Sequence, residues 1–156
     1  MDGREVHSVE NTNPRIFTNV RVFAGDKVKP AADASYRNLL WENFHVDHSF
    51  NIGTKIQENK QIGTIDSWGP FFRVSFDLII HSFVKGKGKQ GWSSVLAFNK
   101  KPSVDLNKNG ELRIFFQQRK YNFISNVDLN RWYTISIEQK PNNKKVREKQ
   151  VLRKAS

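Results

Sequence analysis

Phe72-Arg73-Val74-Ser75-Phe76-Asp77-Leu78-Ile79-Ile80 is the stretch that decides the fold class. Large apolar residues occupy every second position from Phe72 to Ile80, and Arg73, Ser75 and Asp77 alternate with them. Because successive side chains of a strand point to opposite faces, this pattern predicts a strand with one buried face and one polar face.

Shorter runs repeat the same alternation along the chain. Expected strands lie at 18–24, 37–44, 94–98, 112–116 and 132–137. Asn109-Gly110 is the strongest hairpin signal, because both residues tolerate the positive φ of a type I′ turn. Many short strands separated by turns, without a convincing helical stripe, predict an all-β protein with an antiparallel β-sandwich fold.

Composition points to one folded body with a charged end. The 156 residues include 12 Phe and 4 Trp, too many large apolar side chains for a disordered chain. The formal net charge is +11, and residues 140–156 hold seven Lys or Arg and one Glu. We therefore expect a basic, disordered tail at 140–156. Such a charge favours anionic partners, although solubility alone is an equally simple explanation.

Several classes of site and location are constrained by what the sequence lacks. Without cysteine there is no disulfide, thiolate metal site or cysteine catalysis. Met1 to Glu10 contains no apolar stretch of a signal peptide, and no run approaches the roughly 18 apolar residues of a membrane span. Taken as it stands, the chain is expected to stay inside the cell, unless its start is not that of the gene product.

Three stretches carry a family resemblance. Trp132 to Glu138 resembles the tryptophan-led strand of laminin G-like domains. Asp2 to Val6 with Asn19 to Asp26 resembles the Asp-Gly turn and the strand that follow it, and Ala32 to Glu42 resembles the final strand. The chain thus resembles laminin G-like, concanavalin A-like lectin-type domains of cnidarian matrix and lectin-like proteins. The resemblance implies a jelly-roll β-sandwich and an extracellular location.

The order of the matching parts differs from that family. Residues 1–44 resemble the C-terminal half of such a domain, and residues 45–139 resemble its N-terminal half. One strand is missing between Gln139 and Asp2, where the basic tail lies instead. Three explanations fit: a circular permutant, a slice across two tandem repeats, or an open sheet edge that a second copy fills.

The resemblance implies a non-catalytic recognition or structural module that binds anionic glycans or extracellular-matrix proteins. A first alternative is a fragment of a tandem-repeat protein with no independent activity. A second is a divergent, inactive glycosidase-like sandwich, because the closely spaced carboxylates that glycosidases of this fold need do not occur. The chain is therefore expected not to be an enzyme. The basic tail adds nonspecific nucleic acid as a partner.

Loop lysines and neighbouring aromatics form the predicted ligand site. The segment from Lys85 to Trp92 is rich in Gly and Lys, which suit a sulfate or phosphate, and Trp92 suits stacking on a sugar ring. The simpler interpretation is a mobile hairpin connection with a half-buried Trp. The predicted ligand-binding residues are Lys85, Lys87, Lys89, Trp92, Lys100, Lys101, Arg119, Lys120 and Tyr121.

Metal binding and nucleic-acid binding have weaker signals. Calcium at a loop rim, which the resemblance implies as an option, would draw on Asp26, Asp33 and Asp66, although turns also favour Asp. The segment 45–48, with a His at each end, could supply ligands but is better explained as a polar connection. No metal site is therefore assigned. Trp68, Trp92 and Trp132 are expected in the core, which argues against a groove for single-stranded nucleic acid.

Overall fold

The computed structural model describes residues 5–11, 16–43, 47–50, 54–83, 91–99, 102–116, 119–123, 127–142 and 145–154. For β1, β11 and β13 the description is limited to the backbone. The described residues form strands and contain no helix, so none of them belongs to a helix able to cross a membrane.

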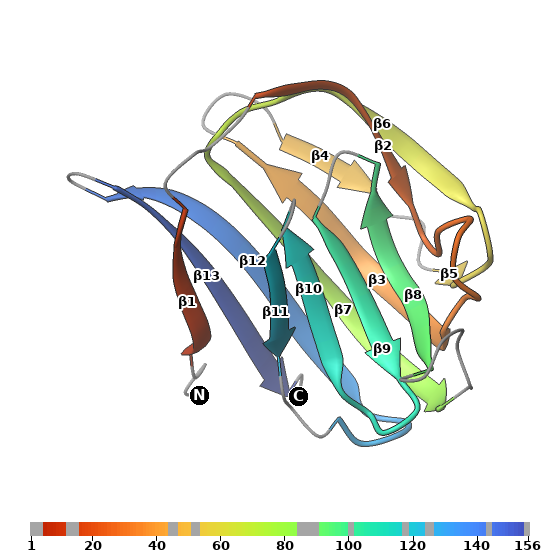
Figure 1. Ribbon diagram of the computed structural model, residues 1–156. Coiled ribbons are helices and arrows are strands. Elements are labelled where there is room, and N and C mark those ends of the chain that lie inside the picture. The colour runs from red at the N-terminus through yellow and green to blue at the C-terminus, as the bar shows by residue number, and fades with distance from the viewer. Residues whose placement is uncertain are drawn as a thin grey trace.

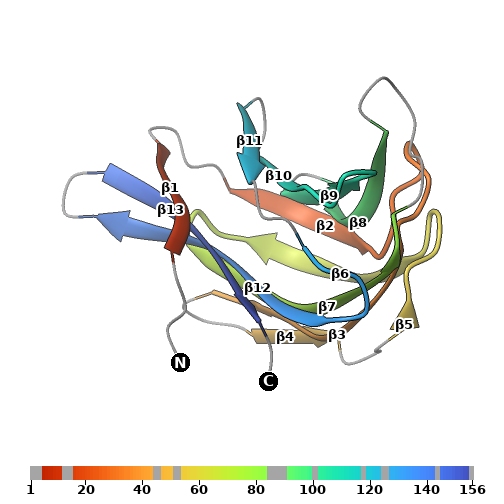
Figure 2. The ribbon, with the colours of Figure 1, turned by 90° about the horizontal axis from the view of Figure 1, so that it is seen from below.

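Two antiparallel sheets pack face to face, which confirms the predicted β-sandwich. Figure 1 looks onto the six-stranded sheet, and Figure 2 shows the two sheets as layers. The six-stranded sheet has the order β11-β10-β9-β8-β2-β6. The seven-stranded sheet has the order β1-β13-β12-β7-β3-β4, and β5 also pairs with β3. The strands are β1 (Glu5–Asn11), β2 (Phe17–Phe23), β3 (Asp33–Glu42), β4 (Asp47–Phe50), β5 (Thr54–Lys55), β6 (Gln61–Trp68), β7 (Phe72–Ser82), β8 (Trp92–Phe98), β9 (Ser103–Asn107), β10 (Leu112–Phe116), β11 (Arg119–Phe123), β12 (Trp132–Asn142) and β13 (Lys145–Lys154).

Strand β7 follows its predicted alternation. Its apolar residues at 72, 74, 76, 78 and 80 are buried, and Arg73 and His81 are exposed. It lies in the middle of its sheet between β12 and β3, so both edges are hydrogen-bonded. The other predicted runs coincide with β2, β3, β8, β10 and β12, although β2 ends at Phe23 and β3 at Glu42, and residue 44 lies outside the described residues.

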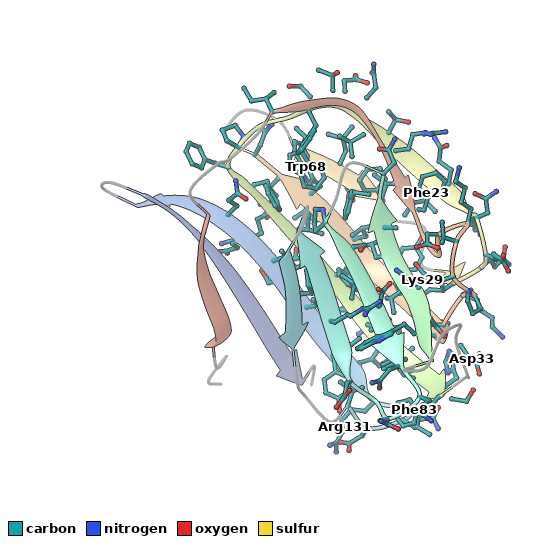
Figure 3. All side chains as sticks on the ribbon, viewed as in Figure 1. Phe23, Lys29, Asp33, Trp68, Phe83 and Arg131 are labelled. Carbon is teal, nitrogen blue, oxygen red and sulfur yellow. The ribbon has the colours of Figure 1, made fainter. Side chains whose placement is uncertain are left out.

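The core is centred on a cluster of aromatic rings that joins the sheets. Trp68 of β6 is 2% exposed, and its ring lies 5.4 Å from that of Trp41 in β3. The rings of Phe72 and Phe98 lie 4.7 and 4.8 Å from Trp68 in edge-on geometry. Trp68 is one of the side chains labelled in Figure 3. Each such pair adds about 1 kcal/mol beyond the burial of its area.

The Asn109-Gly110 hairpin exists, but its turn type differs from the prediction. Gly110 has a φ of 81°, whereas Asn109 is not among the residues with positive φ. The Gly110 amide donates to the Asn107 carbonyl, and the Asn107 amide donates to the Glu111 carbonyl. Asn107 Oδ1 also accepts the amides of Asn109 and Glu111, both at 2.9 Å. Because the Asn107 side chain caps the turn, only one residue needs positive φ.

Residues 145–154 form strand β13 rather than the disordered tail that their charge predicted. β13 pairs with β12 from Asn142↔Lys145 to Tyr133↔Lys154. On its other side it pairs with β1, up to Glu5↔Val151. β12 would otherwise present an unpaired edge along its whole length, which is unfavourable. β13 therefore lies between β12 and β1, where the resemblance predicted that a strand is missing.

The two predicted half-domains share one core. Strands from 1–44 pair with strands from the rest of the chain: β2 with β6 and β8, and β3 with β7. The described residues thus form one body, and residues 44–46, where the predicted boundary falls, lie outside the description.

Candidate functional site

Five of the predicted ligand-binding lysines lie outside the described residues: Lys85, Lys87, Lys89, Lys100 and Lys101. Their described neighbours Gly91 and Asn99 lie at opposite ends of β8, a strand of seven residues. Such a strand is about 20 Å long. The two loops therefore leave the sheet at opposite ends, which does not support a single five-lysine patch, and each loop remains a separate prediction.

The second predicted basic cluster lies in β11, the edge strand of the six-stranded sheet. Arg119, Lys120 and Tyr121 pair in register with Phe116, Phe115 and Ile114 of β10. Their side chains lie outside the description, so their part in ligand binding remains a prediction.

Trp92 is buried and partly covered by an arginine. It is 8% exposed, which agrees with its predicted place in the interior, and the Arg113 guanidinium carbon lies 3.9 Å from its ring centroid. A ring with this little exposure cannot offer a sugar an open face, so the structure favours a packing role over stacking on a ligand.

Arg113 belongs to a buried ion-pair cluster around Asp105. The Asp105 carboxylate is fully buried and accepts bonds from Arg113 Nε at 3.0 Å and from Lys29 Nζ at 2.8 and 3.0 Å. Two cations thus compensate the cost of desolvating one carboxylate. Figure 3 shows Lys29 reaching in beside β8 from the segment after β2.

This cluster anchors the 24–32 segment to the six-stranded sheet. The Ser94 amide donates to the Pro30 carbonyl, and the Ser94 carbonyl accepts the Ala32 amide, both at 2.9 Å. Asp26 Oδ1 accepts the amide of Lys29 at 2.7 Å, which shapes the turn that delivers Lys29. We assign the Asp105 cluster a structural role, because its charges are satisfied internally.

A second arginine–tryptophan stack lies on the opposite surface of the molecule, the outer face of the seven-stranded sheet. Its tryptophan, Trp132, is only partly buried there, so the prediction that it lies in the core was wrong. The Arg37 guanidinium carbon lies 4.1 Å from the Trp132 ring centroid, and Arg37 Nε donates to Asp77 Oδ2 at 3.1 Å. Asp77 also accepts Thr134 Oγ1 at 2.7 Å. In contrast to Arg113, the Arg37 side chain is 45% exposed. Asp77 thus lies on the polar face of β7 that the alternation predicted.

A β-bulge in β3 brings a further donor to Asp77. The register shifts between Arg37 and Leu40, and Asn38 has a φ of 53°, which Asn tolerates. Asn38 Nδ2 donates to Asp77 Oδ2 at 2.9 Å. Because of the extra residue, two consecutive side chains of β3 reach the same carboxylate. We call Arg37, Asn38, Asp77, Trp132 and Thr134 the Arg37 cluster.

Opposing effects set the pKa of Asp77. Burial desolvates the carboxylate and by itself raises the pKa. Hydrogen bonds from Thr134, Asn38 and Arg37 outweigh it, so the pKa lies below its ordinary value of 3.8. Asp77 is therefore ionised at neutral pH and holds the Arg37 cluster together.

Other polar residues on this outer face are paired among themselves. Arg73 Nε donates to Glu138 at 2.5 Å and lies 3.7 Å from Glu42. The Ser35 hydroxyl lies 2.9 Å from His81 Nε2, which superficially suggests a nucleophile and base. Asp33, however, binds Ser82 and Lys55, and no hydrogen bond joins it to His81. The described residues therefore form no Ser-His-Asp triad here.

The predicted calcium ligands lie on different elements. Asp26 shapes a turn, Asp33 begins β3, and Asp66 is exposed on β6. Within the described ranges, no group of three or more His, Asp or Glu side chains is close enough to hold a metal ion. Residue 45 and the His48 side chain lie outside the description.

Sequence reasoning missed the Arg37 cluster as a unit. One local signal existed: buried residues of β3 shift from Ala34 and Tyr36 to Leu39 and Trp41, so the period of two breaks at Asn38. Such a break predicts a bulge. No local pattern, however, connects β3 to residues of β7 and β12 that lie 40 and more positions away.

Comparisons with family models, with curated proteins and with solved structures found no match for this chain. The laminin G-like resemblance therefore stays a prediction beside the β-sandwich that the structure has.

Proposed function

We propose that this protein is a non-catalytic recognition module whose ligands are anionic glycans. The observation that carries the proposal is that described carboxylates are occupied by cations. Asp105 is bound by Lys29 and Arg113, Asp77 by Arg37, and Glu138 by Arg73. Carboxylates held in this way are poorly available as general acids and bases, because their oxygens already bind cations.

Charge supports an anionic ligand. The chain has a net charge of +11, and this excess remains when carboxylates pair with basic side chains. Sulfated or uronate-containing glycans combine negative charge with hydroxyl groups, which suit a polar sheet surface. The resemblance also implies matrix proteins as partners. Only the positive charge of this chain supports them, and it would favour matrix proteins with acidic surfaces.

The position of β13 bears on the alternative of an inactive fragment. That hypothesis depended on a missing strand, and β13 lies between β12 and β1. A filled sheet supports an independently folded module. A permuted order of half-domains is compatible with this pairing, because the start of β1 lies beside the end of β13.

Heparin chromatography of the full chain tests the function. We expect retention at 150 mM salt, and two matched triple variants then locate the charge. Lys85, Lys87 and Lys89→Gln remove three charges from the predicted loop, and Lys145, Lys149 and Lys154→Gln remove three from β13. We expect the loop variant to elute at lower salt than the β13 variant.

Two results would contradict this. A wild-type chain that washes through at 150 mM salt would remove the glycan proposal. Equal elution of both triple variants would instead reduce the interaction to general polycation binding, which follows total charge. Circular dichroism of all three proteins shows whether a shift reflects unfolding.

A further inference from the structure

We propose that the outer face of the seven-stranded sheet carries a saccharide site centred on Arg37, which binds a carboxylate or sulfate group of the sugar. The inference rests on the proposed function and names the residue and ligand group for it. It adds a contact on the sheet face to the loop contacts that the sequence predicted.

Arg37 is held in place while part of its guanidinium stays open. Asp77 accepts Nε at 3.1 Å, and Trp132 supports one face of the group at 4.1 Å. The two terminal nitrogens make no hydrogen bond to any described residue, and the side chain is 45% exposed. An oriented guanidinium with its terminal donors free matches the two oxygens of a carboxylate or sulfate. Its fixed rotamer lowers the entropy lost on binding.

Arg113 shows what the same arrangement looks like in a structural role. It also stacks on a tryptophan and donates Nε to an aspartate, at 3.9 and 3.0 Å. A second contact, from Arg113 Nη2 to Asp105 Oδ2 at 3.0 Å, engages a terminal nitrogen, and the Arg113 side chain is only 10% exposed. Arg37 lacks such a second contact, and this difference singles it out for a ligand.

The bulge adds a neutral polar group next to the arginine. Asn38 is exposed and uses Nδ2 for Asp77, while its Oδ1 makes no hydrogen bond within the described part of the chain. A free amide oxygen accepts bonds from sugar hydroxyls. Guanidinium and amide are consecutive in sequence and converge on one carboxylate, so an anionic group and a neighbouring hydroxyl can be bound together.

The nearest acidic residues do not block an anion. The Asp77 carboxylate accepts three donors, which spreads its charge over Arg37, Asn38 and Thr134. Near the start of β7, Arg73 pairs with Glu42 of β3 and with Glu138 of β12. The terminal guanidinium nitrogens of Arg37 are therefore the groups of this cluster that would bind a negatively charged sugar.

Titration of the full chain with a heparin hexasaccharide at 150 mM salt tests the site. We expect Arg37→Gln to weaken binding about tenfold, the effect of losing one charge-assisted contact. Arg131→Gln is the matched control, because Arg131 is 50% exposed, is paired with Asp128 and loses the same charge. It should change affinity less than about twofold, as expected for a screened surface charge. Arg37→Lys should lose nearly as much as Arg37→Gln, because lysine cannot bind Asp77 and present a fork together.

Each outcome of this titration either supports or overturns the Arg37 site. Equal losses in Arg37→Gln and Arg131→Gln would overturn the site, as would full affinity in Arg37→Lys. A carboxyl-reduced and a desulfated hexasaccharide then distinguish which anionic group binds, and unchanged affinity for both would also overturn it. If wild type binds while Arg37→Gln is unaffected, the site is wrong and the proposed function stands; if wild type does not bind, the function itself fails. Circular dichroism of each variant excludes unfolding as the cause.

Discussion

At the residue scale, burial decides whether a polar group stabilises the fold or remains available. Tyr133 is 2% exposed, and its hydroxyl accepts the Asp128 amide at 2.7 Å and lies 3.2 Å from Asp128 Oδ2. Burial of the phenol, the main cause, raises the pKa of Tyr133 above 10.0. Tyr36 is 3% exposed, yet its hydroxyl makes no hydrogen bond to a described residue.

We expect Tyr133→Phe to lower the free energy of unfolding by about 1–2 kcal/mol, because the Asp128 amide loses its acceptor. Tyr36→Phe is the control and should change it by less than about 0.5 kcal/mol, since no bond is lost. Urea denaturation of both variants measures the difference. Similar values for the two would contradict the assigned bond.

At the element scale, β13 decides how the seven-stranded sheet ends. It lies between β12 and β1 and hydrogen-bonds to both. The composition of this end of the chain is typical of a solvated tail, because six of the seven basic residues of 140–156 lie within 144–154. Backbone pairing outweighs this composition, because sheet hydrogen bonds do not depend on side-chain type.

Removal of residues 145–156 should destabilise the protein rather than release a passive tail. β12 would lose a ten-residue partner and β1 would lose its neighbour in the sheet. We expect loss of amide protection in β12 and β1 and self-association through the exposed edge. Hydrogen exchange and light scattering measure both effects, and a chain ending at residue 154 is the control. A monomeric 1–144 chain with unchanged unfolding free energy would show that β13 does not stabilise the sheet.

At the scale of the whole molecule, carboxylates on the outer face link stability to acid. The pKa values of Asp33 and Asp77 both lie below 3.8. For Asp33 the main cause is the Ser82 hydrogen bond; for Asp77 several hydrogen bonds outweigh burial. The folded state therefore binds fewer protons than the unfolded state in acid. This contribution is complete above the unfolded pKa and is lost as the pH falls through the folded values.

We expect the free energy of unfolding to fall with decreasing pH below about 3.8, the ordinary aspartate pKa. Asp77→Asn should make this fall shallower, because one group with a lowered pKa is removed. Thr134→Val removes one hydrogen bond to Asp77 and should move the remaining fall to higher pH. Urea denaturation from pH 2 to 6 measures all three proteins. An identical pH profile in wild type and Asp77→Asn would exclude this linkage.

Local pattern alone determined the fold class, and the tertiary structure decided where polar groups meet. The alternation from Phe72 to Ile80 and the Asn109-Gly110 turn were sufficient, because side-chain period and turn chemistry act between near neighbours. Neither the pairing of β13 nor the contact of Asp77 with Arg37 and Thr134 could be predicted from the sequence. These partners lie 40 and 57 positions apart. Their contact depends on strand order and on the bulge at Asn38, which only the packed sheets establish.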